Sequence, residues 1–224
     1  MARLPRLVVP GHAHWVIQRG NRASLAFVDA ADRARFLLLL SEAAALHPVQ
    51  VLAWALLDHE LQLLAVPTTV NGLSLLMQAV GRRYVSAYNR RHGGAGSLWD
   101  GRFRCAVVAP GGTLLDVLVH IDGLGGLGGL GGDGAVTSRA QRFAPGRPAW
   151  LVDPPELWQL GNTPFEREAA YQRLVSVGLA PAAAQRIRQA ALGGWALGAN
   201  AAALDATRWR LGPRRPGRPK KSSG

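Results

Sequence analysis

Residues 49–66 read VQVLAWALLDHELQLLAV. Two apolar runs, Val49–Leu57 and 61–66, are separated only by the polar tripeptide at 58–60. Short apolar runs that are rich in valine and leucine and are bounded by polar residues are typical of buried strands. Because so few residues connect them, the two runs predict an antiparallel pair of strands.

The segments on both sides of this pair continue the alternation of strands and helices. Before it, residues 14–18 predict a strand, and residues 29–46 predict a helix with Asp29 as its N-cap. After it we expect an amphipathic helix, a strand and a third helix, at residues 72–91, 105–108 and 113–121. The order β-α-β-β-α-β is that of the split βαβ, ferredoxin-like sandwich. We therefore predict an α+β fold in which one antiparallel sheet carries its helices on one face.

The rest of the chain has weaker patterns. Residues 123–150 open with a leucine-glycine repeat, and glycine disfavours a regular helix, so we predict a glycine-rich loop or linker there. Residues 162–177 and 180–192 predict a small helical pair within a C-terminal extension over 151–207. The last residues, 208–224, predict a basic tail that stays disordered until it is bound.

Composition narrows the class of partner and the compartment. The chain has 26 Lys and Arg against 14 Asp and Glu, a formal net charge of +12, which favours nucleic acid as partner. The alternative is a GC-rich genome that prefers arginine codons. The single Cys105 excludes an internal disulfide framework and a cysteine-based zinc site. No apolar run approaches the roughly 20 residues that span a bilayer, so we expect no membrane association and a cytoplasmic, nucleoid-associated bacterial protein.

Arginine and aromatic residues gather at the end of the predicted 72–91 helix and just after it. Cations of this kind neutralise phosphates, and aromatic rings stack on unpaired bases, so the set predicts a surface for single-stranded DNA. Its members are Arg82, Arg83, Arg90, Arg91, Trp99, Arg102, Phe103 and Arg104. For Phe103 the alternative is a place in the hydrophobic core.

The basic tail is a second candidate DNA contact. Its cations alternate with proline and glycine, as in an AT-hook that enters a narrow minor groove. They are Arg214, Arg215, Arg218, Lys220 and Lys221. General attraction to phosphate is the alternative.

Several segments together resemble one family. The clearest is Leu-Trp-Asp-Gly-Arg-Phe-Arg at 98–104, and the others lie at residues 2–6, 11–12, 18–22, 77–85, 160–167 and 194–198. They are similar to the REP-associated, single-tyrosine "HUH" transposases of bacteria, and the last two to the helical extension of one subgroup. The resemblance implies a transposase-like domain over 1–122, single-stranded or hairpin DNA as partner, and a homodimer. It also implies DNA contacts from the polar turn, through Arg19, Asn21 and Arg22.

The resemblance also places the metal ligands of the family. Its members carry two histidines, one residue apart, on a strand that aligns here with 57–64, so Glu60 and Gln62 stand at the two histidine positions. Residues i and i+2 of a strand project from the same face and can converge on one ion. A glutamate oxygen and a glutamine carbonyl suit Mg²⁺ or Mn²⁺, so a weak divalent-metal site is conceivable.

The nucleophile position is altered as well. The tyrosine of the family lies in a helix context like Arg-Tyr-Ile-Glu, and the matching residues 119–122 place His120 there. A histidine can be phosphorylated, although the phosphoramidate is more labile than a phosphotyrosine. The alternative is that Glu60, Gln62 and His120 are ordinary polar residues at a strand start and a helix end.

These observations lead to one hypothesis and two rivals. The first is a DNA-binding protein of the transposase family with impaired catalysis, which would cleave one strand by metal-dependent transesterification if it is active. The second is a purely non-catalytic DNA-binding or regulatory protein that keeps the fold and its basic face. The third is an RNA-binding protein, since a ferredoxin-like sheet also supports RNA recognition.

Overall fold

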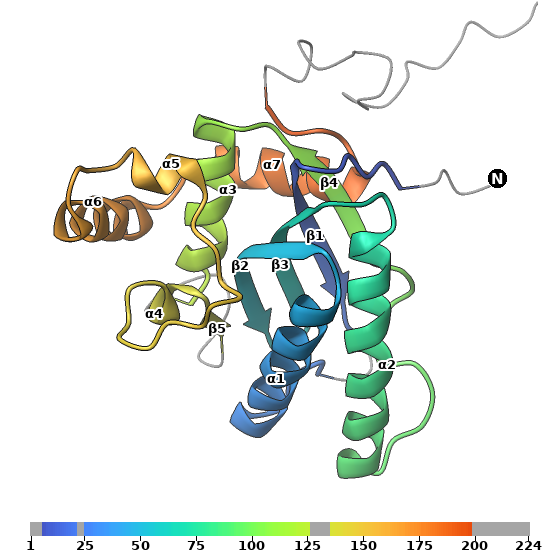
Figure 1. Ribbon diagram of the computed structural model, residues 1–224. Coiled ribbons are helices and arrows are strands. Elements are labelled where there is room, and N and C mark those ends of the chain that lie inside the picture. The colour runs from blue at the N-terminus through green and yellow to red at the C-terminus, as the bar shows by residue number, and fades with distance from the viewer. Residues whose placement is uncertain (1–5, 22–24, 126–134, 199–224) are drawn as a thin grey trace, which may run out of the picture.

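The computed structural model describes residues 6–21, 25–125 and 135–198 (Figure 1). Its five strands form one antiparallel sheet in the order β4-β1-β3-β2-β5. In that order the strands are Arg104–Val108, Ala13–Arg19, Glu60–Pro67, Val49–Leu57 and Val136–Thr137. Strands β1 and β2 run in the same direction with β3 between them, which is the split βαβ arrangement. The predicted α+β fold is confirmed.

The central elements lie where the apolar patterns predict them. Strand β2 has the predicted bounds, and β3 begins one residue earlier than expected, at Glu60. Helix α1 spans Ala30–Leu46, and α2 spans Gly72–His92. The Asp29 side chain accepts hydrogen bonds from the first backbone N–H groups of α1, as an N-cap does.

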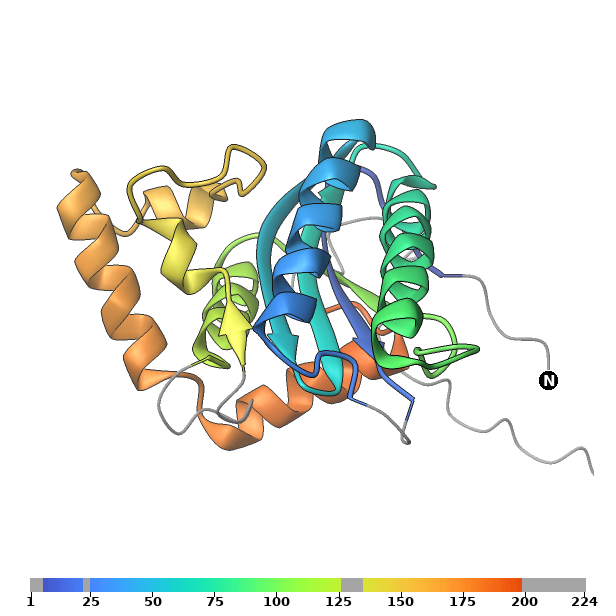
Figure 2. The same ribbon diagram turned by 90° about the horizontal axis from the view of Figure 1, so that it is seen from below.

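Helices cover both faces of the sheet, not one face as expected. Helices α1 and α2 cover the first face, and α3, Gly112–Gly123, lies on the second together with the C-terminal helices (Figure 2). The reason is visible in β3, which sends Leu61 and Leu63 into the first core and Leu64 into the second. Strands that are apolar on both sides need a covering layer on each face.

The predicted linker over 123–150 forms part of the sheet. Residues 126–134 lie outside the described ranges, but β5 extends the sheet by pairing with Ala55 and Leu56, and the short helix α4, Arg139–Arg142, follows it. Buried Arg142 fastens this segment by donating to Asp122 at 2.9 Å, to Asp153 at 3.0 Å and to the Leu52 carbonyl at 2.8 Å.

The C-terminal extension shares the second core. It comprises α5, α6 and α7, which span Pro155–Trp158, Pro164–Val177 and Pro181–Gly193. Thr163 and Glu166 form a capping box at the start of α6, which explains why α6 begins where it does. Tyr171 and Ala191 are buried against the sheet with α3. None of the helices in the described part of the chain is long and apolar enough to cross a membrane.

Candidate functional site

Glu60 and Gln62 open strand β3 and lie side by side on the sheet face that α3 and α7 cover. Both side chains are buried. The Gln62 amide donates from Nε2 to Glu60 Oε1 at 2.8 Å. A carboxylate only accepts hydrogen bonds, so this contact fixes the amide with its nitrogen toward Glu60. The spacing of two residues therefore brings the pair together as the strand pattern predicts.

An arginine from the extension occupies the same place. Arg188 on α7 donates from its two terminal nitrogens to both Glu60 oxygens, at 2.8 and 2.7 Å, across a separation of 128 residues. Arg19, which faces Glu60 in the pairing of β1 with β3, donates to Oε2 at 3.3 Å. With Gln62, each Glu60 oxygen accepts two hydrogen bonds, and an ionised carboxylate has about four lone-pair sites.

The charge of the centre is balanced without a metal ion. Burial alone would raise the pKa of Glu60, but the hydrogen bonds and the positive charge of Arg188 outweigh it and lower that pKa below its usual value. Glu60 is therefore an anion held by a guanidinium. A planar guanidinium matches a carboxylate in two places, which makes this the strongest kind of side-chain ion pair.

His120 lies on α3 next to this ion pair. Its ring packs edge-on against Trp15, with the ring centres 5.3 Å apart. Burial, followed by the nearby charge of Arg188, lowers the pKa of His120 to about 4, so the imidazole is neutral at neutral pH. Two buried atoms of the centre, His120 Nε2 and Gln62 Oε1, have no hydrogen-bond partner among the described residues.

The residues present do not fit the divalent ion that the resemblance implies. A Mg²⁺ or Mn²⁺ ion at Glu60 and Gln62 would need carboxylate lone pairs that Arg188, Arg19 and Gln62 already use. It would also have to approach a guanidinium at hydrogen-bond distance from the same oxygens. Within the described ranges, no group of three or more His, Cys, Asp or Glu side chains could hold a metal ion.

No family model matches the chain, and no curated protein matches it. Two solved structures resemble it. The structure of a REP-associated tyrosine transposase bound to a REP hairpin aligns at 14% identity with a TM-score of 0.47, covering 55% of this chain and 71% of that one. The crystal structure of a transposase candidate from Deinococcus radiodurans R1 aligns at 20% identity with a TM-score of 0.36, covering 49% and 87%.

Some arginines of the predicted basic surface form ion pairs within the protein, and others do not. Arg91 pairs with Asp29 and Asp32 and so ties the end of α2 to the start of α1, and Arg83 pairs with Glu42. Arg82 and Arg90 are exposed and form no ion pair with a described residue. About half of the predicted helix cluster is therefore free to meet phosphate.

The loop before β4 holds the rest of that surface. Phe103 is buried, and the Arg6 guanidinium lies over its ring at 3.8 Å, so Phe103 is a core residue and not a stacking platform as expected. Trp99 is half-buried and Arg102 is exposed, as is Arg104, the first residue of β4. The backbone N–H of Asn21 donates to the Leu98 carbonyl at 2.8 Å, which joins the polar turn to this loop.

Some predicted residues lie outside the described ranges, and two residues that the structure adds were missed. Arg22 and the tail cations, Arg214, Arg215, Arg218, Lys220 and Lys221, fall in the first group. Arg188 and Arg6 form the second. No sequence pattern indicates the partner of either arginine, because each contacts a residue about a hundred or more positions away.

Proposed function

We propose that this chain is a DNA-binding protein of transposase-like fold that holds single-stranded or hairpin DNA without cutting it. The observation that carries the proposal is the ion pair in which Arg188 donates to both oxygens of Glu60. It supplies a positive charge where the family resemblance puts the metal ion. A metal would polarise the scissile phosphate, and a guanidinium whose donors are already paired with a carboxylate does not replace it.

The nucleophile position supports the same conclusion. His120 is neutral at neutral pH and partly covered by Trp15. Transesterification needs a nucleophile that reaches the phosphate in line, next to the group that stabilises the developing charge. Here the neighbouring charge pair is internally satisfied, so nothing in the centre activates His120.

Binding itself rests on the charge of the chain and on where the unpaired cations lie. The net charge is +12, and four exposed arginines on α2, in the loop before β4 and at the start of β4 form no ion pair with a described residue: Arg82, Arg90, Arg102 and Arg104. Unpaired cations of this kind release counterions from a nucleic acid when they bind it, so the affinity depends on salt. Half-buried Trp99 adds an aromatic ring that suits unpaired bases.

The binding half of the proposal is tested by fluorescence anisotropy with a labelled DNA hairpin that carries single-stranded flanks. We expect saturable binding to the full chain at low salt, weakening steadily as NaCl rises. An anisotropy that stays flat at 50 mM salt and micromolar protein would refute DNA binding. Light scattering of the free protein then tests the homodimer, which rests on the family resemblance alone.

Metal-dependent strand cleavage is the second candidate, and one observation favours it. His120 Nε2 and Gln62 Oε1 are buried near Glu60 and have no hydrogen-bond partner among the described residues, so the centre holds two unused atoms that could bind a metal ion. This candidate requires Arg188 to leave Glu60 before Mg²⁺ or Mn²⁺ can bind. It predicts Mn²⁺-dependent cleavage of a single-stranded hairpin by the full chain, which the binding proposal does not.

A further inference from the structure

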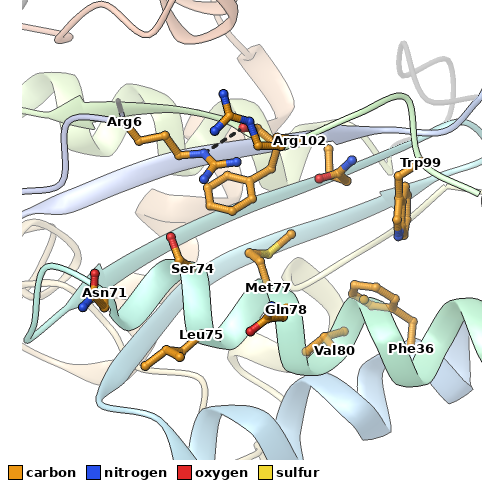
Figure 3. Close-up of a pocket in the computed structure, with 13 residues that line it drawn as sticks. Arg6, Phe36, Asn71, Ser74, Leu75, Met77, Gln78, Val80, Trp99 and Arg102 are labelled. Carbon is orange, nitrogen blue, oxygen red and sulfur yellow. Dashed lines mark hydrogen bonds between the residues drawn. The ribbon is translucent and has the colours of Figure 1, made fainter. Parts of the chain in front are cut away.

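A pocket of about 500 Å³ opens on the opposite side of the sheet from Glu60, between α2 and the loop before β4 (Figure 3). Gln18, on β1, lines the pocket, and its amide donates to the Gly101 carbonyl at 3.1 Å, which anchors the loop. Figure 3 shows Ser74, Met77 and Gln78 of α2 along one side and Trp99 at one end. Pockets that enclose small ligands have volumes of roughly 300–1,000 Å³.

The charge around the pocket is of one sign. Arg6 and Arg102 line it, and none of its lining residues is acidic. The Arg6 guanidinium is held in place over the Phe103 ring, with its Nε donating to the Phe103 carbonyl at 3.2 Å. Cations without an acidic residue in the same lining favour an anionic ligand.

The remaining lining suits a flat heterocycle. Trp99 and Met77 offer an aromatic ring and a polarisable thioether, both of which pack well on planar rings. Ser74 and Gln78 offer donors and acceptors, and their side chains form no hydrogen bond with the described residues. An aromatic ring, free polar groups and cations are the features that bind the base and the phosphate of a nucleotide.

We propose that this pocket holds one unpaired nucleotide of a bound DNA strand, with the base beside Trp99 and Met77 and the phosphate near Arg6 and Arg102. The inference rests on the proposed function and adds where an unpaired nucleotide is held. Paired bases cannot enter, because their faces are stacked within the duplex. The pocket therefore makes the protein prefer a single strand to a duplex of the same charge.

The test compares affinities for a labelled 12-nucleotide single strand and for a blunt 12-base-pair duplex. Ser74→Trp fills the pocket from α2, and Arg102→Ala removes one of its cations. We expect Ser74→Trp to weaken binding of the single strand roughly tenfold, the size of one lost base stack, and to leave duplex binding unchanged. Arg102→Ala weakens the single strand more than the duplex.

Arg173→Ala is the matched control, since Arg173 is an exposed arginine on α6, far from the pocket (Figure 1). Circular dichroism checks that each variant is folded. If Ser74→Trp does not fold, the pocket assignment is tested with Arg102→Ala alone. The pocket assignment is overturned if wild type binds DNA but the folded variants lower single-strand affinity no more than Arg173→Ala does. Tighter binding of a matched RNA strand overturns the assignment to DNA. Failure of wild type to bind either DNA probe refutes the proposed function itself.

Discussion

Glu60 shows how a buried carboxylate is satisfied by the side chains around it. Its carboxylate stands at a metal-ligand position by resemblance, yet it receives four hydrogen bonds from three side chains. A buried carboxylate needs such compensation, because an unpaired charge away from water is costly. The donors that satisfy Glu60 are the same groups that leave no lone pair for an ion.

Replacing Arg188 is expected to expose a weak metal site. Arg188→Ala frees two lone pairs of Glu60 and brings Gln62 Oε1 and His120 Nε2 into reach, so Mn²⁺ binds the variant in the millimolar range. Losing this partly exposed ion pair also lowers the free energy of unfolding by about 1–3 kcal/mol. Titration followed by electron paramagnetic resonance measures free Mn²⁺.

Arg186→Ala is the control for that titration, because Arg186 is an exposed arginine on the same helix. It makes the same change in net charge without touching Glu60. If wild type and Arg186→Ala bind Mn²⁺ as tightly as Arg188→Ala, the guanidinium does not block the site.

His14 makes stability depend on pH. Its Nδ1–H donates to the His12 carbonyl at 2.8 Å and its Nε2 accepts from the Val9 N–H at 3.0 Å, so it is held neutral. Burial lowers the pKa of His14 from 6.5 to about 4. Between those values the unfolded chain binds a proton that the folded chain does not, so stability falls as the pH falls through this window and is full above it.

The expected loss from His14 is about 3 kcal/mol in the free energy of unfolding at pH 4. Urea unfolding of wild type and His14→Gln at pH 7 and pH 4 measures it, with His59→Gln, at an exposed position, as control. His120 adds a similar loss in the same window, which both variants keep. An equal decrease in wild type and His14→Gln would contradict the role of His14.

At the scale of elements, local sequence patterns predict most strands and helices. The position of the short strand β5 depends instead on contacts between residues far apart in the sequence. The bounds of β2, α1 and α2 follow from runs of apolar residues, and the start of α6 follows from Thr163 and Glu166. The short strand β5 has no such pattern, since it follows a glycine repeat. Its pairing with β2 is reinforced by hydrogen bonds of Thr137 and Ser138 and by Arg142, an arginine that is fully buried in the fold.

Removing Arg142 is expected to loosen β5 and α4. Arg142→Met leaves the buried carboxylate of Asp122 without its cation and the Leu52 carbonyl without a donor, which lowers the free energy of unfolding by about 3–5 kcal/mol. Urea denaturation followed by circular dichroism measures the change. Arg139→Met is the matched control, because Arg139 is half-buried and its hydrogen bonds within the described ranges go to the neutral Gln172. A loss no larger than the control's would show that the network is not stabilising.

At the scale of the molecule, the structure separates two regions on opposite faces of the sheet. The second face carries the closed Glu60–Arg188 centre, and the first carries α2, the basic loop and the pocket at Trp99. The sequence indicates the basic loop through its composition, and the family resemblance points to the polar centre at Glu60 and Gln62. The sequence does not reveal that the Glu60 oxygens are already occupied, because the arginine that occupies them, Arg188, lies 128 residues away.

The net charge of +12 and the unpaired arginines near the pocket predict that the affinity for DNA is governed by charge. The logarithm of the affinity for single-stranded DNA falls linearly with the logarithm of the salt concentration, and each phosphate contact contributes about 0.7 to the slope. Arg102→Ala is expected to reduce the slope by about that amount, and Arg188→Ala to leave it unchanged, because Arg188 is paired with Glu60. Anisotropy titrations from 50 to 300 mM NaCl measure it. Equal slopes for wild type and Arg102→Ala would remove Arg102 from the interface.

The most direct test of the account is a denaturing gel of a labelled single-stranded hairpin after long incubation with the full chain and Mn²⁺. We expect the DNA to remain intact and unattached at every Mn²⁺ concentration, while the same mixture gives a salt-sensitive shift on a native gel. A shortened strand, or a covalent protein–DNA adduct that disappears in His120→Ala, would contradict the account and show that the centre at Glu60 still cuts DNA.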